Sequence, residues 1–287
     1  MSIVITGATG HYGNRVIQEL LKTIPASEII ASVRNVEKAD ALAELGIEVR
    51  HGDYMDYESM KTSFEDASKV LFVSGPDSDN TLRIRQHANV VQAARDAGVK
   101  HIAYTGYAFG ETSQIDLAHV HLATEYAIRS TGVPYTFLRN SLYSDVFIDE
   151  SLAGSVSTGE IVTNTGDGKL NAVSREDLAL AAAAVLTGEG HENKSYNLVN
   201  PSPWTFDELA EVVSEVSGKQ VSHKKVSFDE MKDYLGNVGL PAPVAELIAG
   251  IYHTVAAGET GKTSNDLTNL IGQPTPLKKL VQQALKA

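Results

Sequence analysis

Short apolar runs alternate with stretches of helical periodicity through the first half of the chain. The apolar runs predict strands over residues 3–6, 29–33, 48–51, 69–73, 101–105 and 135–138. Between them, apolar positions three and four residues apart predict helices near 12–22, 37–45, 56–66, 80–97 and 118–131. Gly98 and Gly132 stand where two of these helices should end. This alternation is typical of right-handed βαβ units, so we expect an α/β fold with a Rossmann-type, doubly wound parallel sheet.

The second half has a different pattern. Residues 154–168 are rich in Gly, Ser, Thr and Asn, and they predict a hairpin or loop. Ser174, followed by acids at Glu176 and Asp177, predicts the start of an alanine-rich buried helix. Further elements are expected as strands over 196–199 and 219–226 and as amphipathic helices from Thr205 and Ser227.

The chain is long enough, at 287 residues, for one large domain with a smaller lobe. We expect residues 1–150 to form the Rossmann core, with a later segment of about 170–200 returning to it. Residues 151–287 should then form most of a smaller α/β lobe that is interleaved with the core.

The first strand ends in a glycine-rich turn that leads directly into a helix. Gly7, Gly10 and Gly13 have the spacing G-x-x-G-x-x-G. Such a turn allows backbone N–H groups and the helix N-terminus to approach a pyrophosphate without interference from Cβ atoms. The sequence therefore predicts a dinucleotide site. The other side chains of the turn expected to line it are Thr9, His11 and Tyr12.

The residue after the second strand indicates which dinucleotide binds. An NAD site usually has Asp or Glu there, to accept hydrogen bonds from the ribose 2′-hydroxyl. This chain has Arg34, with Lys38 close behind. A guanidinium binds a 2′-phosphate that a carboxylate would repel, so we predict NADP(H). The alternative for Arg34 is an ordinary exposed arginine at a strand end.

Two later turns should complete the dinucleotide site, since they follow the third and fourth strands. Asp53 is expected to face the adenine amino group and Tyr54 to flank the base. Ser74, Gly75 and Pro76 should pass close to the nicotinamide ribose. For both segments a plain strand-ending turn is the alternative.

Short-chain dehydrogenases of the usual type carry Tyr-x-x-x-Lys on the fifth helix, where the tyrosine acts as acid and base. A common longer version continues to Glu four residues after the lysine. Counting back from Glu125 places His121 in the lysine position and Leu117 in the tyrosine position. The phenolic acid is thus absent, and His121 is a candidate to hold the ribose or donate a proton. A structural histidine is the alternative.

Several aromatic residues follow the fifth and sixth strands or precede a helix of the lobe. Tyr107, Tyr143, Phe147 and Trp204 are candidates for an aromatic wall around a flat ring substrate. Ordinary packing of loop aromatics is the alternative.

Charge and composition exclude several function classes. The net charge of −12, without a dense run of Lys or Arg, disfavours nucleic-acid binding. The absence of cysteine excludes disulfides and thiolate chemistry, and we expect no metal. No apolar run approaches the ~20 residues that span a bilayer. A strand at residue 3 leaves no length for a signal peptide. We expect a cytoplasmic protein, as a possible homodimer.

Taken together, these motifs resemble the NmrA-like atypical short-chain dehydrogenases, and among them the triphenylmethane reductases and type-2 NAD(P)H:quinone oxidoreductases. The resemblance is carried by Gly7-Ala8-Thr9-Gly10-His11-Tyr12-Gly13, Val33-Arg34-Asn35, His51-Gly52-Asp53-Tyr54, Leu71-Phe72-Val73-Ser74-Gly75-Pro76, Ala118-His119-Val120-His121-Leu122-Ala123-Thr124-Glu125 and residues 135–140 and 200–209. It spans essentially the whole chain.

The resemblance implies direct hydride transfer from NADPH to triphenylmethane dyes or quinones, without metal or flavin. A cationic dye needs no proton, which accounts for the missing tyrosine and lysine. The alternative is an NADP-binding redox sensor without catalysis, since some NmrA-like proteins are of that kind. A nucleotide-sugar epimerase ranks last, because Leu117 cannot exchange a proton with an alcohol.

Overall fold

The chain folds into two compact units, each built from several segments. The computed structural model describes residues 2–286. The first unit comprises residues 1–140, 175–198 and 266–272, and the second comprises 141–174, 199–265 and 273–287.

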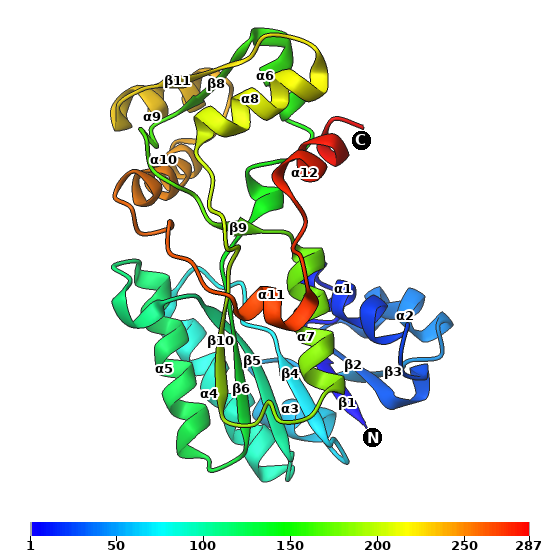
Figure 1. The fold of residues 1–287 in the computed structure, drawn as a ribbon. Helices are drawn as coiled ribbons and strands as arrows, with labels where there is room; N and C mark the ends of the chain where they lie inside the picture. Colours follow the sequence, from blue (N-terminus) through cyan, green and yellow to red (C-terminus); the bar gives the residue numbers. More distant parts are fainter. Residues whose placement is uncertain (1, 287) are drawn as a thin grey trace. The chain divides into compact units, whose positions relative to one another are not determined.

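A seven-stranded parallel sheet forms the centre of the first unit (Figure 1). Its strands lie in the order β10-β6-β5-β4-β1-β2-β3. They are β1 (Ile3–Thr6), β2 (Ile29–Val33), β3 (Glu48–His51), β4 (Lys69–Phe72), β5 (His101–Tyr107), β6 (Tyr135–Asn140) and β10 (Lys194–Leu198). Strand order reverses beside β1, with β2 on one side and β4 on the other, and every pairing is parallel. This confirms the doubly wound Rossmann-type sheet.

Helices cover both faces of this sheet. They are α1 (His11–Leu20), α2 (Asp40–Glu44), α3 (Tyr57–Ser63), α4 (Asn80–Asp96), α5 (Asp116–Ser130), α7 (Arg175–Thr187) and α11 (Asp266–Ile271). Helix α1 packs on α7, whereas α4 packs between α3 and α5. Phe72 and Tyr104 of the sheet are fully buried in the core beneath α3, α4 and α5. Gly98 and Gly132 follow α4 and α5 with φ of 73° and 75°, which confirms the predicted helix ends.

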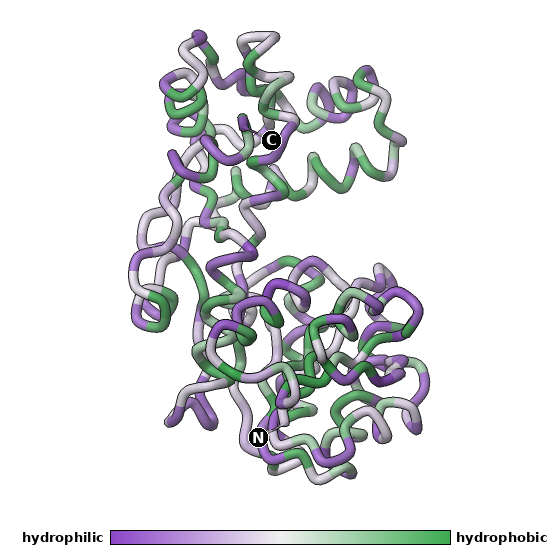
Figure 2. The backbone as a smooth tube through the Cα atoms, turned by 90° about the vertical axis from the view of Figure 1, so that its right-hand side faces the viewer, coloured by the Kyte–Doolittle hydropathy of each residue, from purple (hydrophilic) through white to green (hydrophobic). Residues whose placement is uncertain are grey.

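The second unit contains two short parallel strand pairs and several helices. The pairs are β7 (Leu142–Tyr143) with β9 (Ala172–Val173) and β8 (Glu160–Thr163) with β11 (Ser222–Lys225). The helices are α6 (Leu152–Thr158), α8 (Phe206–Ser217), α9 (Phe228–Asn237), α10 (Ala242–Ala256) and α12 (Leu277–Ala284). Helices begin after Thr205 and Ser227, as predicted, and each of these residues forms a capping box. Hydrophobic and hydrophilic stretches are interspersed along the backbone (Figure 2).

The prediction of a hairpin or loop over residues 154–168 was wrong for its first part. The segment instead contributes the end of α6 and the strand β8, which pairs in parallel with a distant strand. Ser157 and Thr158 donate hydrogen bonds to backbone carbonyls four residues earlier, so their hydroxyls are compatible with the helix. Ile161 is buried in the core of the second unit. Tertiary packing therefore outweighed the local preference of Ser, Thr and Gly for turns.

No helix within residues 2–286 is long and apolar enough to cross a bilayer.

Candidate functional site

A pocket of about 410 Å³ lies within the first unit, at the carboxyl ends of β1, β2, β3 and β4. We call it the glycine-loop pocket. It is lined by Gly7, Thr9, Gly10, His11, Tyr12, Gly13, Ser32, Val33, Arg34, Gly52, Asp53, Tyr54, Val73, Ser74, Gly75, Pro76, Gln86 and Arg175. The pocket lies where the strand order reverses, which is the usual ligand position in open α/β sheets.

The glycine turn is shaped for close backbone packing. Gly7 has φ of +60°, a conformation that side chains with a Cβ rarely adopt. A Cβ on Gly13 would lie 2.4 Å from the Gly7 carbonyl oxygen, so only glycine fits there. The Gly10 N–H donates to the same carbonyl at 2.9 Å. Helix α1 begins at the next residue, and its N-terminus opens on the pocket. This backbone fits the pyrophosphate of a dinucleotide.

Arg34 lines the pocket directly after β2, and its side chain is exposed. The carboxylate expected of an NAD site is therefore replaced by a cation at this strand end. Lys38 lies on the following short 3₁₀ turn, Val36–Ala39, and is exposed. It is not among the residues that line the pocket in the described part of the chain.

Tyr54 holds the pocket wall together through a closed set of hydrogen bonds. Its hydroxyl donates to the Val73 carbonyl at 2.6 Å and lies 2.5 Å from the Thr6 hydroxyl. The Val73 N–H in turn donates to Thr6 Oγ1 at 2.9 Å. Burial raises the pKa of Tyr54, so the phenol keeps its proton. Tyr54 thus joins the ends of β1 and β4, a role that its sequence position does not indicate.

Asp53 also lines the pocket, and it forms a turn. Its carboxylate accepts a hydrogen bond from the Met55 N–H at 2.9 Å. The Asp53 N–H donates to Ser59 Oγ at 3.0 Å. The turn and a contact with adenine are compatible, and the latter stays a prediction.

The turn after β4 is fixed by side chains from helix α4 and strand β5. The Gly75 N–H donates to His87 Nε2 at 3.0 Å. The Ser74 N–H donates to Thr105 Oγ1 at 2.9 Å, and Ser74 Oγ accepts a hydrogen bond from Arg83 Nη2 at 2.8 Å. Our reading of the sequence identified Ser74 and Gly75 but missed His87 and Arg83. The histidine and arginine lie at ordinary helix positions, and only the fold brings them to this turn.

The contacts of His87 define its tautomer. Because Nε2 accepts from Gly75, the proton lies on Nδ1, which is 2.7 Å from Thr124 Oγ1. Thr124 donates its own proton to the Val120 carbonyl at 2.8 Å. Burial, with a smaller contribution from the Arg83 cation, lowers the pKa of His87 to about 3. The imidazole is therefore neutral at physiological pH and acts as a fixed acceptor for the pocket wall.

His121 is buried on helix α5, where its Nδ1 lies 2.8 Å from the hydroxyl of Tyr104. Burial, and then the charge of Arg83, lowers the pKa of His121 to about 3. An imidazolium at this position is therefore disfavoured at neutral pH. Among the described residues that line the glycine-loop pocket, His121 is absent.

The four candidate aromatic residues belong to two units. Tyr107, in the first, is half-buried and stacks on His121 with ring centroids 6.4 Å apart. Tyr143, in the second, is half-buried. Phe147 and Trp204 are buried in the core of the second unit, with centroids 6.4 and 5.3 Å from that of Phe206. The structure gives these two a packing role, and their contact with a substrate stays a prediction.

Arg175 is a further residue that sequence reasoning missed. We interpreted residues 174–177 only as the start of a helix, which is correct for α7. The fold also places Arg175 in the wall of the glycine-loop pocket. No local signal marks this role, because it depends on the packing of α7 against α1.

Within residues 2–286, no group of three or more His, Asp or Glu side chains is arranged to hold a metal ion.

Known proteins resemble this chain over nearly its whole length. Quinone oxidoreductase 2 of Escherichia coli K12 is 41% identical over 273 residues, which cover 95% of this chain and 94% of the relative. The NADPH-bound structure of that enzyme has a TM-score of 0.92 and covers 98% of this chain and 99% of its own.

The triphenylmethane reductase of Citrobacter sp. is also similar. Its structure is 64% identical over 100% of both chains, with a TM-score of 0.99. A second structure of it, complexed with NADP(H), is 65% identical, covers 99% of this chain and 100% of that one, and has a TM-score of 0.97. The family model described as NmrA-like matches residues 1–277. The chain therefore belongs to the NmrA-like family.

Proposed function

We propose that the protein is an NADPH-dependent reductase that transfers hydride to flat aromatic acceptors such as quinones or triphenylmethane dyes. The observation that carries the proposal is the glycine-loop pocket with Arg34, not a carboxylate, at the end of β2. Relatives that share at least 40% of their residues with this chain over nearly its whole length are quinone and triphenylmethane reductases, with structures that contain NADP(H) or NADPH.

Different residues of the pocket bind different parts of the dinucleotide. The turn from Gly7 to Gly13 and the N-terminus of α1 receive the pyrophosphate, while Arg34 pairs with the 2′-phosphate. Ser74, Gly75 and Pro76 form the part of the pocket wall that contacts the nicotinamide ribose. His87 holds this turn in place by accepting a hydrogen bond from the Gly75 N–H. NADPH supplies the hydride when it is bound.

The acceptor decides whether a proton is needed. Hydride addition to the central carbon of a cationic triphenylmethane dye gives the neutral leuco dye, with no proton consumed. Hydride addition to a quinone gives a hydroquinone anion, which takes one proton. Since the pKa of His121 is about 3, its imidazolium is not available as the donor at neutral pH. We propose that His121 acts instead as a rigid support for Tyr107, and that Tyr107 contacts the acceptor ring.

The test combines turnover with binding. Purified protein should oxidise NADPH when malachite green or a benzoquinone is added, and it should do so without added metal or flavin. Tight NADPH binding with no turnover of either acceptor would favour the redox-sensor alternative. Absence of NADPH binding would overturn the proposal as a whole.

A charge-matched pair of variants tests the cofactor assignment. Arg34→Gln should weaken NADPH binding by about tenfold to a hundredfold and leave NADH binding unchanged, because only NADPH carries the 2′-phosphate. Lys38→Gln removes an equal charge from a position outside the pocket lining and should have little effect. Titration of both cofactors into the three proteins checks this. Unchanged preference for NADPH in Arg34→Gln, with loss in Lys38→Gln, would move the assignment to Lys38.

Two further expectations complete the proposal. We propose that the protein works in the cytoplasm and forms a homodimer. Its lack of cysteine suits a reducing compartment. Fractionation of the cell and light scattering of the purified protein test the two statements.

A further inference from the structure

Arg175 lines the glycine-loop pocket although it is far from the glycine turn in the chain. It is the first residue of α7, and the start of α7 is tied to the start of α1. Arg15 Nε lies 2.5 Å from the Glu176 carboxylate, and Arg15 Nη1 donates to the His11 carbonyl at 3.0 Å. The Tyr12 hydroxyl donates to the Leu178 carbonyl at 3.2 Å. These bonds place Arg175 at the glycine-turn end of the pocket.

The two helix starts differ in their charges. The first turn of α1 carries no acidic residue, so its N-terminal partial positive charge stays available to a ligand. The first turn of α7 carries Glu176 and Asp177, which offset the dipole of α7 itself. What α7 contributes to the pocket lining is therefore Arg175 and not an unscreened helix N-terminus.

The two pocket arginines lie on different elements. Arg34 follows β2, where the adenosine ribose of a dinucleotide is held in this fold. The Arg15–Glu176 ion pair and the hydrogen bond from Tyr12 to the Leu178 carbonyl join the start of α7 to α1. A pyrophosphate at the glycine turn thus lies on the Arg175 side of the pocket.

We infer that Arg175 is a second phosphate-binding arginine, which engages the pyrophosphate common to NADPH and NADH. The inference rests on the proposed function, because it assumes that a dinucleotide fills the pocket. Paired, charge-assisted N–H donors from a guanidinium complement the backbone N–H groups of the glycine turn. Arg34 then determines which dinucleotide binds, while Arg175 strengthens the binding of both.

Two mononucleotides separate these roles. ADP carries the pyrophosphate without a 2′-phosphate, and 2′-AMP carries the 2′-phosphate without a pyrophosphate. Arg175→Gln should weaken NADPH, NADH and ADP by a similar factor, about tenfold to a hundredfold, and leave 2′-AMP unchanged. Arg34→Gln should weaken NADPH and 2′-AMP and leave ADP unchanged. Calorimetric or fluorescence titration of the full chain measures all of these without turnover.

Matched variants show whether the effect belongs to this guanidinium. Arg85→Gln removes the same charge from an exposed position on α4 and should bind every ligand like the wild type. Arg175→Lys keeps the charge but loses the paired donors, so its binding should lie between those of the wild type and Arg175→Gln. Thermal unfolding of each variant without ligand shows whether the fold is retained.

Hydrogen exchange gives a readout independent of affinity. At saturating NADPH, amides at the start of α7 should exchange more slowly than in the free protein, and Arg175→Gln should lose this protection while the glycine turn keeps its own.

The results that overturn the inference are distinct from failure of the proposed function. Loss of NADPH and 2′-AMP binding alone in Arg175→Gln would make Arg175 a 2′-phosphate ligand. Unchanged binding of all four ligands in a folded variant would make it a wall residue only. If the wild-type protein binds neither NADPH nor NADH, the proposed function itself is wrong.

Discussion

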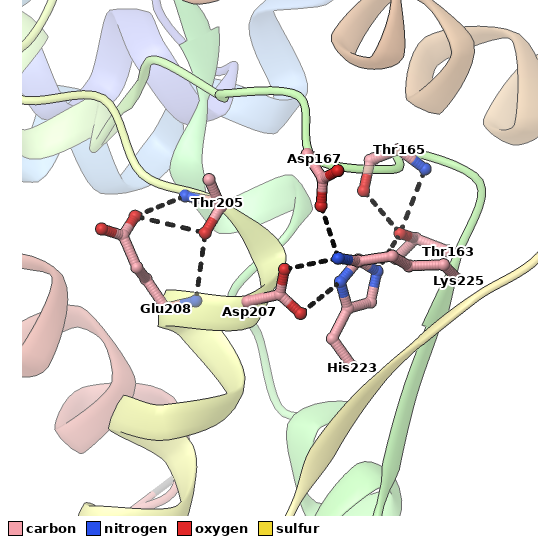
Figure 3. A network of polar contacts seen from close by, with 8 residues as sticks. All are labelled: Thr163, Thr165, Asp167, Thr205, Asp207, Glu208, His223 and Lys225. Carbon is pink, nitrogen blue, oxygen red and sulfur yellow. Dashed lines mark hydrogen bonds and ion pairs between the residues drawn. The ribbon is translucent and has the colours of Figure 1, made fainter.

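Each unit contains a buried histidine held between hydrogen-bonding partners, and the two sites have opposite surroundings. In the first unit, His87 joins the Gly75 N–H to the Thr124 hydroxyl. In the second unit, His223 joins the Asp207 carboxylate, at 3.2 Å, to the Thr163 hydroxyl, at 2.7 Å (Figure 3).

The difference lies in the charges that face each imidazole. Lys225 lies 2.5 Å from Asp167 and 2.8 Å from Asp207, so His223 belongs to an ionic network (Figure 3). Burial lowers the pKa of His223, and Asp207 opposes that effect. For His87 the nearby charge is the Arg83 cation, which adds to the effect of burial.

Similar hydrogen bonds thus position different parts of the molecule in the two networks. The His87 site fixes residues that line the glycine-loop pocket, namely Ser74 and Gly75. Among the described residues, none of the eight in Figure 3 lines that pocket. We therefore expect the first network to affect cofactor binding and stability together, and the second to affect stability alone.

Acidification should have the largest effect. His87 and His121 have folded-state pKa values of about 3, against an ordinary value of 6.5. Below pH 6.5 the unfolded chain binds protons that the folded chain does not. These histidines therefore cost no stability above pH 6.5, and below it the free energy of unfolding falls as the pH decreases toward 3, by up to about 1.4 kcal/mol per pH unit for each histidine. Urea unfolding between pH 7.5 and 4.5 measures this.

A variant isolates the contribution of one histidine to this slope. His121→Gln should reduce the loss of stability between pH 6.5 and 4.5, since it removes one of the buried histidines with a lowered pKa, which also include His87 and His101. A replacement of the exposed His119 by Gln should leave the slope unchanged. Equal slopes in all three proteins would show that His121 is not held neutral by burial.

Replacement of His87 should come next in size. His87→Leu removes the acceptor of the buried Gly75 N–H and should destabilise the fold by about 2–3 kcal/mol. It should also weaken NADPH binding, because the turn at Ser74 and Gly75 loses its support. Denaturant unfolding and NADPH titration check the two effects. Loss of stability with unchanged NADPH binding would show that the turn is fixed without His87.

Asp207→Asn should have the smallest effect. The asparagine keeps an oxygen acceptor for His223 but loses the ion pair with Lys225, whose partners are both partly exposed. The expected loss of stability is below about 1 kcal/mol, with no change in NADPH binding. A clear change in cofactor affinity would contradict the separation of the two networks.

The sequence by itself determined the central sheet and the position of the glycine turn. These depend on signals within a few residues, such as apolar runs and the spacing of Gly7, Gly10 and Gly13. The residue that follows β2 could likewise be identified, because a strand end is found by counting along the chain. Thus Arg34 was found in the pocket lining as predicted, although its contact with a 2′-phosphate stays a prediction.

Tertiary structure alone decided which distant side chains line that pocket or hydrogen-bond to the residues that line it. His87 meets Gly75 only because α4 packs against the sheet, and Arg175 meets the glycine turn only because α7 packs on α1. The helix α6 likewise formed in a segment whose composition favours turns. Such outcomes depend on contacts between residues distant in the chain, whose free energies outweigh the local preferences that a sequence pattern records.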